Sequence, residues 1–276
     1  MAAINQYYDN FVLQNEINNM YLTSLNMAQF CTPDTSLVGT AGDIVKVNVY
    51  DATTGAEEVD LGVGNTKAIT TTLTTKQYKV KTVQTRFAWL DEEERRDPYV
   101  PIVGVQKLGA DLVNKMFSDI YAEFEKTTLF HATTGDYFAD FIDTVALLTL
   151  DPLHAGNGDE TLDPTSMCFA IVNKKDVAKI RKSLKDQLKY VEAFARVGYV
   201  GTVAGVNLYV SNMAKEGSIV IGHRSGVKLI TKKTVELERD REVNIRKNWA
   251  YARQVYIPVL HDPTKIAIIN ATGSAS

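Results

Sequence analysis

The 276-residue sequence predicts an α+β fold, because strand-like and helix-like patterns occupy separate parts of the chain. In residues 43–90 apolar residues alternate with polar ones, the period of a half-buried strand. In residues 102–131 they recur every three or four positions, the period of an amphipathic helix. From residue 199 onward, short apolar runs are separated by Gly and Asn, as in a sheet of short strands.

Composition and charge exclude several classes of protein. Hydrophobic residues make up 45% and charged residues 23%, which excludes a mostly disordered chain and a collagen. The net charge of −3 provides no general positive field that would attract nucleic acid. No apolar run approaches the roughly 18 residues of a membrane span, so we expect no contact with a membrane.

The N-terminal segment carries little charge. Residues 4–29 are loosely helical in spacing and contain only two charges, Asp9 and Glu16, so they are expected to pack on their own domain or on a neighbouring subunit. No Lys or Arg occurs in the first 30 residues, which fits neither a secretory signal nor a transit peptide. Cys31 and Cys168 form no C-x-x-C unit and are expected to be buried thiols in a reducing cytoplasm.

Residues 43–90 predict an extended two-stranded arm. Val45, Val47 and Val49 alternate with polar residues, and a second alternating run extends from Tyr78 to Trp89. Six of the ten residues 66–75 are Thr, whose branched Cβ favours extended backbone. Because an arm this polar cannot bury a core of its own, we expect it to project and to lean on a partner, with a flexible surface loop as the alternative.

The next elements are an acidic helix start and a long helix. Asp91 is expected to cap the first helix, with Glu94 three residues later as in a capping box; a group of catalytic carboxylates is the alternative. Pro98 and Pro101 interrupt this helix. The helix predicted over 102–131 would form a rod of roughly 45 Å, with Gly135 ending the element.

The second half of the chain mixes helix and strand. The acidic loop 151–165 lacks the spacing of a calcium loop. Residues 169–172 predict a buried strand, and Asn173 is expected to cap a helix over 174–197. The polar face of this helix has a net charge of +5, which fits a solvated face or ion pairs between subunits; contact with phosphate is the alternative. The strands expected after residue 199 are 206–210, 218–221, 227–231, 243–246, 251–259 and 265–269, with a charged bend at Asp240.

Motifs for catalysis are absent from the sequence. The four histidines (His131, His154, His223 and His261) are not at metal-ligand spacing. The sequence contains no nucleophile elbow and no phosphate-binding glycine loop. We therefore expect a protein that is not an enzyme and that holds no cofactor and no metal; the opposing hypothesis, a cytoplasmic enzyme, predicts a small monomer or dimer with a deep apolar pocket.

The order of these segments indicates a protein family more specifically than any single motif in the sequence does. The chain begins with a low-charge arm, followed by a Thr-rich hairpin, an acidic helix start and a rod helix. The later strands lie in GTVAGVNLYVSN (201–212), in the stretch 217–258 and in DPTKIAIIN (262–270). The closing stretch carries glycines after strands (Gly217, Gly222 and Gly226), the charged bend, Arg246 and the pair Tyr251 and Arg253. Across essentially its whole length, the chain resembles the major capsid proteins of tailed bacteriophages, which have the Hong Kong 97-type fold.

The resemblance implies a division of the chain. It places an N-terminal arm at 1–40 and an extended loop at 41–90, which would lie over an adjacent subunit. A peripheral domain with the spine helix would follow at 91–140 and an axial domain at 141–230. Residues 231–276 would return through the peripheral strands to the axial domain and end in the tail. The residues then expected at inter-subunit contacts are Lys67, Thr71, Lys76, Tyr78, Lys81, Glu92, Glu93, Arg95, Arg96, Arg239, Asp240 and Arg241.

The function that the resemblance implies is self-assembly into pentamers and hexamers of an icosahedral shell around double-stranded DNA. The protein would belong to the virion capsid and would assemble in the cytoplasm of a bacterial host. Because the chain reaches the arm at once, scaffolding is expected from a separate protein or from none. Portal and decoration proteins are further expected partners. The alternative is an encapsulin-like compartment of the same fold that encloses a cargo enzyme.

Overall fold

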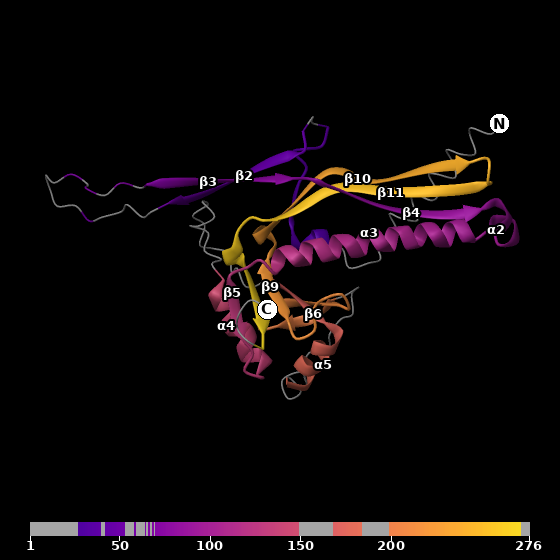
Figure 1. The fold of residues 1–276 in the computed structure, drawn as a ribbon. Coiled ribbons are helices and arrows are strands. Elements are labelled where there is room, and N and C mark those ends of the chain that lie inside the picture. The colour runs from indigo at the N-terminus through magenta and orange to yellow at the C-terminus, as the bar shows by residue number, and fades with distance from the viewer. Residues whose placement is uncertain are drawn as a thin grey trace.

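The computed structural model describes residues 27–39, 42–52, 70–148, 168–183 and 199–271, together with the single residues 58, 64, 66 and 68. In these residues it contains a two-stranded hairpin, a four-stranded sheet and a six-stranded sheet. The hairpin and the four-stranded sheet extend in opposite directions, and the six-stranded sheet lies on the other side of the long helix α3 (Figure 1). The predicted α+β fold class is confirmed.

The hairpin consists of β2 (Ile44–Ala52) and β3 (Thr71–Lys79), which pair antiparallel from Ile44↔Lys79 to Ala52↔Thr71. Nearly every described side chain of β3 is exposed, so the arm has no core along most of its length. Its base is held by Val47 and Val80, which pack into a small cluster on the four-stranded sheet. The predicted projecting arm is confirmed, although the run predicted from Tyr78 to Trp89 divides at Val80 into two strands.

The four-stranded sheet has the order β1-β10-β11-β4. It is formed by β1 (Thr32–Asp34), β4 (Lys81–Leu90), β10 (Val227–Glu242) and β11 (Lys247–Leu260). One face packs against α3 (Val100–Phe124), where buried Val105, Leu108 and Leu112 meet Trp89, Leu237, Ala250 and Ala252. The small alanines on β11 allow the helix axis to approach the sheet closely.

The helix α3 ends seven residues before the predicted end at residue 131. Beyond Phe124 the chain becomes extended, and β5 (Leu129–Ala132) pairs in parallel with β12 (Ile266–Asn270). Thr127 Oγ1 donates to the carbonyl oxygens of Pro263, at 3.0 Å, and of Ile266. Pairing with a strand near the far end of the chain therefore ends the helix, and neighbouring residues carry no signal of this.

The six-stranded sheet has the order β5-β12-β9-β6-β8-β7. Its other strands are β6 (Cys168–Asn173), β7 (Tyr199–Val203), β8 (Val206–Ser211) and β9 (Ile219–His223). Helices α4 (Tyr137–Leu147) and α5 (Lys174–Ser183) cover it, with Phe141, Val177 and Ile180 in its core. The predicted division at 140/141 falls inside α4, whose contacts are with β5 and β12 of this sheet.

Several local predictions are confirmed here. Asn173 Oδ1 accepts a hydrogen bond from Lys175 N at 3.0 Å and so caps α5, and the buried strand predicted over 169–172 is β6. Cys31 and Cys168 are free and fully buried. The segments 151–165, 184–197 and 1–26 lie outside the described residues, but Met27 and Phe30 of the short 3₁₀ turn η1 (Met27–Phe30) pack in the core beside α3.

Two predictions near the end of the four-stranded sheet are wrong. The expected strand 243–246 is the turn between β10 and β11, closed by Arg246 at a φ of 51°, and the expected bend at Asp240 lies within β10. The short 3₁₀ turns η4 (Arg224–Gly226) and η5 (Pro263–Lys265) connect the two sheets. β10 continues past Asp240 because its backbone stays paired with β11, from Asp240↔Trp249 to Glu242↔Lys247.

The start of the acidic helix also differs by one residue. Helix α2 is Asp91–Arg96, so Leu90 and not Asp91 occupies the N-cap position. Glu93 Oε2 accepts from Leu90 N at 2.9 Å, which satisfies one amide at the helix start. Asp91 cannot act as the cap because its carboxylate is engaged elsewhere, with Arg241 and Asn248.

Candidate assembly surfaces

The hairpin formed by β2 and β3 presents three of the predicted contact residues, and a fourth follows at the start of β4. Thr71 and Lys76 are exposed, and Lys81 is exposed at the start of β4, whereas Lys67 lies outside the described residues. Tyr78 is half-buried at the base, where burial, with Glu123 as a second cause, raises the pKa of its phenol. The hairpin base is also fastened to β10, since Lys232 Nζ contacts Asp43 Oδ1 at 2.6 Å.

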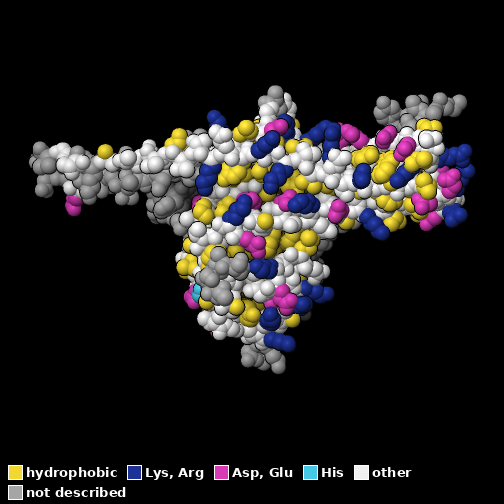
Figure 2. Space-filling view, viewed as in Figure 1, with side chains coloured by type: hydrophobic (Ala, Val, Ile, Leu, Met, Phe, Trp, Pro, Cys, Tyr) yellow, Lys and Arg dark blue, Asp and Glu magenta, His cyan; other side chains and the backbone are white. Residues whose placement is uncertain are grey.

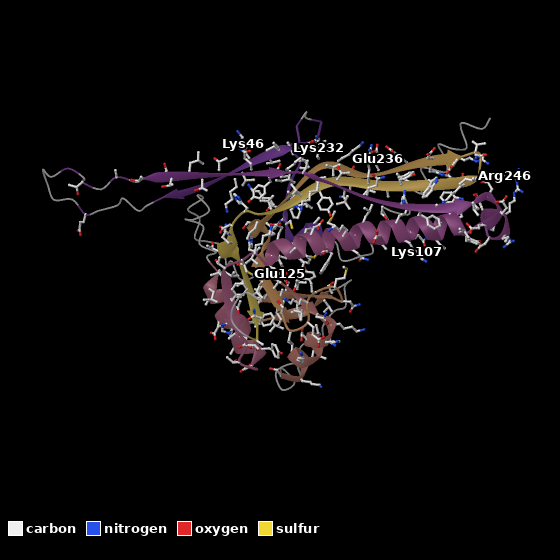
Figure 3. All side chains as sticks on the ribbon, viewed as in Figure 1. Lys46, Lys107, Glu125, Lys232, Glu236 and Arg246 are labelled. Atoms are coloured by element: carbon white, nitrogen blue, oxygen red, sulfur yellow. The ribbon has the colours of Figure 1, made fainter. Side chains whose placement is uncertain are left out.

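A second group of predicted residues meets at the far end of the four-stranded sheet. We call this the distal end; it comprises residues 90–103, which include α2 and the first turn of α3, and the turn 243–246. Glu92, Glu93, Arg95 and Arg96 are exposed on α2, and Arg246 lies beside this helix (Figure 3). Arg246 Nη1 is 3.8 Å from Glu92 Oε1, and Asp91 N donates to Arg246 O at 3.1 Å. The fold therefore joins segments about 150 residues apart in the sequence.

Several charges of the distal end are already paired within the chain. Arg241 Nη2 lies 2.6 Å from Asp91 Oδ2, and Asn248 Nδ2 donates to Asp91 Oδ1 at 2.7 Å. The hydrogen bond from Asn248, followed by the bond from Arg241, lowers the pKa of the Asp91 carboxyl. Arg239 lies over the Trp89 ring at 5.4 Å, and Asp240 accepts from Arg241 N. Arg239 and Arg241 therefore also hold the subunit itself together, whereas the contact of Asp240 is local.

The distal end also has an apolar part, which was not predicted from the sequence. Leu90, Tyr99, Val103, Val243 and Ile245 account for five of the eleven large hydrophobic side chains that are exposed among the described residues. Val243 is 74% exposed, which is unusual for an apolar residue in a turn. Hydrophobic and charged side chains are interspersed at this end (Figure 2). The exposed Val and Ile within a charged stretch were the available signal, but the strand prediction assigned them to a sheet.

The face of the four-stranded sheet opposite α3 carries dense charge of both signs. Arg253 Nη2 contacts Glu236 at 2.8 Å and Glu238 at 2.9 Å. Trp249 lies between Arg86, at 5.1 Å, and Lys247, at 4.2 Å from its ring centre. Many charges of the stretch 236–247 therefore find partners within their own sheet, and only part of this stretch remains for contacts between subunits.

The described residues contain a small pocket near titratable side chains. A pocket of about 150 Å³ lies beside α4, α5 and β9, lined in part by Tyr137, Asp176 and Lys179. Both carboxylate oxygens of Asp176 are engaged, Oδ2 with Gly217 N and Oδ1 with Lys179 Nζ, each at 2.7 Å. In the described ranges, no three His, Cys, Asp or Glu side chains are grouped to hold a metal ion, and no helix is long and apolar enough to span a membrane.

Solved structures with the same fold are shells and shell-like particles. The capsid of Ralstonia phage GP4 aligns with a TM-score of 0.65 and 9% identity, covering 90% of this chain and 87% of that one. The virus-like particle from Pyrococcus furiosus aligns at 0.60 and 13%, covering 95% and 97%. The mature capsid of bacteriophage PhiM1 aligns at 0.60 and 10%, covering 88% and 85%. No family model and no curated protein matches the sequence.

The chain therefore has the fold of proteins that build closed particles. Within that class, its projecting hairpin, long helix and two sheets are those of the Hong Kong 97-type fold of phage major capsid proteins, as the resemblance in the sequence predicted.

Proposed function

We propose that this chain is the major capsid protein of a tailed bacteriophage, a structural protein that self-assembles into an icosahedral shell enclosing double-stranded DNA. The observation that carries the proposal is the hairpin of β2 and β3, which projects from the body (Figure 1) and in which nearly every side chain of β3 is exposed. Ordering such an arm costs conformational entropy that its own contacts do not offset, so a neighbouring copy is its natural support. The similarity of fold to phage capsids supports the same reading.

The proposal assigns a role to each part. Residues 1–40 would be an N-terminal arm, residues 41–90 the loop that contacts a neighbour, and α3 with the four-stranded sheet the peripheral domain. The six-stranded sheet with α4 and α5 would be the axial domain that gathers around the centres of pentamers and hexamers. Separate scaffolding, portal and decoration proteins would complete a virion assembled in the bacterial cytoplasm.

The first experiment is to express the full chain and measure particle size by size-exclusion chromatography with light scattering and by negative-stain microscopy. We expect closed particles or capsomers. A single 30.6 kDa species at high concentration would refute the proposal.

A shortened hairpin gives a matched variant. Ala52 and Thr71 are cross-strand partners, so replacing residues 53–70 by Asn-Gly closes the hairpin without disturbing the body. We expect a folded subunit with an unchanged thermal transition that no longer forms closed particles. Normal particles from this variant would show that the hairpin is not an assembly element.

The second candidate is an encapsulin-like compartment around a cargo enzyme, favoured by the match to the Pyrococcus furiosus particle over nearly the full length of both chains. Particle content separates the two functions. Nuclease-resistant double-stranded DNA in particles from the natural host supports the phage capsid, and a co-purifying cargo protein without DNA supports the compartment.

A further inference from the structure

The two large sheets are joined by a short double connection. β9 leads through η4 into β10, and β11 leads through η5 into β12. The two connections touch, because His261 N and Asp262 N both donate to Gly226 O, at 2.9 and 3.1 Å. The packing at Gly226 is tight, since a Cβ atom there would lie 2.8 Å from a side-chain carbon of β12. We call this place the sheet junction; it comprises residues 223–228 and 261–265.

A buried ring nitrogen of the sheet junction has no hydrogen-bond partner. His261 Nδ1 is shielded from solvent, and no donor or acceptor in the described part of the chain reaches it. Burial, followed by the charge of Lys228, lowers the pKa of this imidazole, while the charges of Asp262 and Lys265 oppose each other. A buried polar atom without a partner in the protein points to a bound water or ion. The neutral ring can carry its proton at Nδ1 and is then able to donate to an anion.

The ammonium group of Lys265 is also incompletely paired. Its side chain is 13% exposed, and the one ion pair that the described residues give it is with Asp262 Oδ2 at 3.6 Å, which is too long for a hydrogen bond. The other oxygen of this carboxylate, Oδ1, accepts from Thr264 N at 3.0 Å and from Thr264 Oγ1 at 2.6 Å. Asp262 is therefore engaged in its own turn, and a largely buried ammonium with three donors lacks acceptors among the described residues.

The charge of the sheet junction is mainly positive. Its two segments contain three cations, Arg224, Lys228 and Lys265, and one carboxylate. Arg224 is exposed, and its guanidinium forms no ion pair with the described residues. After burial, the charges of Lys265 and Arg224 lower the pKa of His223, so both cations lie near the same histidine. The cations of the two connections therefore gather at one place.

The carboxylates on neighbouring elements do not neutralise these cations. On β1, Asp34 Oδ1 accepts from Ser36 N at 2.9 Å, and the hydrogen bonds of Ser36, with Lys228 as a smaller cause, lower the pKa of Asp34. On α3, Glu123 contacts Lys126 through one carboxylate oxygen, and the other accepts from the backbone N of the last residue of β11 at 3.4 Å. Each of these acids has a partner of its own.

A tetrahedral oxyanion fits this set of donors. A phosphate group has several strong acceptor oxygens, guanidinium binds it through a planar pair of N–H groups, and ammonium binds it as a point charge. We propose that the sheet junction binds a phosphate group, held by Arg224, His261 and Lys265. Inorganic phosphate and the backbone of a nucleic acid offer the same chemistry. Only the second of these sources rests on the proposed function, because the site lies within one subunit.

Equilibrium dialysis of the full chain against radiolabelled inorganic phosphate, at constant ionic strength, tests the site. Lys265→Gln is the test variant, and Arg224→Gln, at an exposed position that should not affect folding, is the second. The matched control is Lys175→Gln, which replaces an exposed lysine paired with Glu216. We expect the wild type and the control to bind a single phosphate per chain, and each test variant to bind about tenfold more weakly.

His261→Leu separates ligand binding from a structural role. Removal of an unpaired buried polar atom should leave the melting temperature in chloride equal or higher. In the wild type, each tenfold increase in phosphate above the Kd should raise the melting temperature by about 2–4 °C. This rise should shrink in His261→Leu and persist in Lys175→Gln, which also controls for the general stabilising effect of phosphate on proteins. An equal rise in both variants would overturn the role of His261.

Competition with a short double-stranded DNA identifies the source of the phosphate group. Displacement of the labelled ion by the duplex, with a salt dependence of duplex binding that falls by about one in slope in Lys265→Gln, assigns the site to a nucleic acid backbone. Binding that the duplex leaves unchanged assigns it to the free ion. Either result supports the site.

The outcomes separate this inference from the proposed function. Normal wild-type particles without bound phosphate, or with equal binding in Lys265→Gln, would overturn the site and leave the shell function standing. A wild-type chain that binds a single phosphate but forms no particles would overturn the shell function and leave the site standing.

Discussion

Gly104 of α3 lies directly against the Phe87 ring of β4, and this contact sets how closely the long helix approaches the sheet. A Cβ atom built at Gly104 would lie 2.1 Å from Phe87 Cε1 and 2.4 Å from Cδ1. Ordinary carbon contacts begin near 3.5 Å, so Gly104→Ala requires a displacement of more than about 1 Å. The Phe87 ring is stacked on Trp89, with centroids 5.7 Å apart, which limits its freedom to move.

Two opposing effects decide the size of the change. Overpacking of this kind costs about 1–3 kcal/mol. Replacing a glycine inside a helix by alanine contributes about 1 kcal/mol in the opposite direction. Because the required displacement is large, we expect the upper part of the first range and a net loss of about 1–2 kcal/mol in the free energy of unfolding. The melting temperature of the unassembled subunit should fall by about 3–6 °C.

The control is the same substitution in a Phe87→Ala background, measured by thermal or urea unfolding of the unassembled subunit. Without the ring, the added methyl group has space, and the helix propensity of alanine should make Gly104→Ala neutral or stabilising by up to about 1 kcal/mol. A stabilising effect in the wild-type background, or an equal loss in both backgrounds, would refute the close approach as the cause.

Three further predictions follow from burial, capping and titration. Burial raises the pKa of Cys31 to about 12, so neither Cys31 nor Cys168 should react with a thiol reagent at pH 8 until denaturant unfolds the chain; fast reaction of the native protein would contradict their burial. Asn173→Ala removes the cap of α5 and should lower stability by about 1 kcal/mol, whereas Asn173→Ser should retain most of it, both measured by urea unfolding. Burial and neighbouring cations lower the pKa values of His223 and His261, so their neutral forms are favoured in the folded state. Their contribution to stability is present above the ordinary histidine pKa of about 6.5 and is lost as the pH falls below it. The melting temperature should therefore drop between pH 7 and pH 5, and less so in a His223→Gln/His261→Gln variant; an unchanged drop would place the titrating groups elsewhere.

Much of the local structure was predictable because it depends on residues close together in the sequence. The alternation of Val45, Val47 and Val49 predicted β2, and the long apolar stripe predicted α3. Asn173 before a charged amphipathic segment predicted the cap of α5. These signals are periodicities and caps, which require no knowledge of the rest of the chain.

The errors lie where distant segments compete with local pattern. α3 ends at Phe124 because β5 pairs with β12, more than 130 residues later in the chain. Asp91 has the right side chain for a cap, yet Arg241 and Asn248 occupy its carboxylate. The same difference holds for the two candidate assembly surfaces. The composition predicted the polar hairpin, but it did not predict the apolar side chains of the distal end.

The sequence alone determined that this protein has a polar arm, a long amphipathic helix and short sheet segments, and the order of these segments pointed to a shell-forming fold. Only the tertiary structure decided which charges are already paired within the subunit and, among the described strands, that β4 lies at an edge of its sheet. The physical reason is that side-chain periodicity is written in neighbouring residues, whereas hydrogen bonds and ion pairs between strands depend on which distant segments the fold brings together.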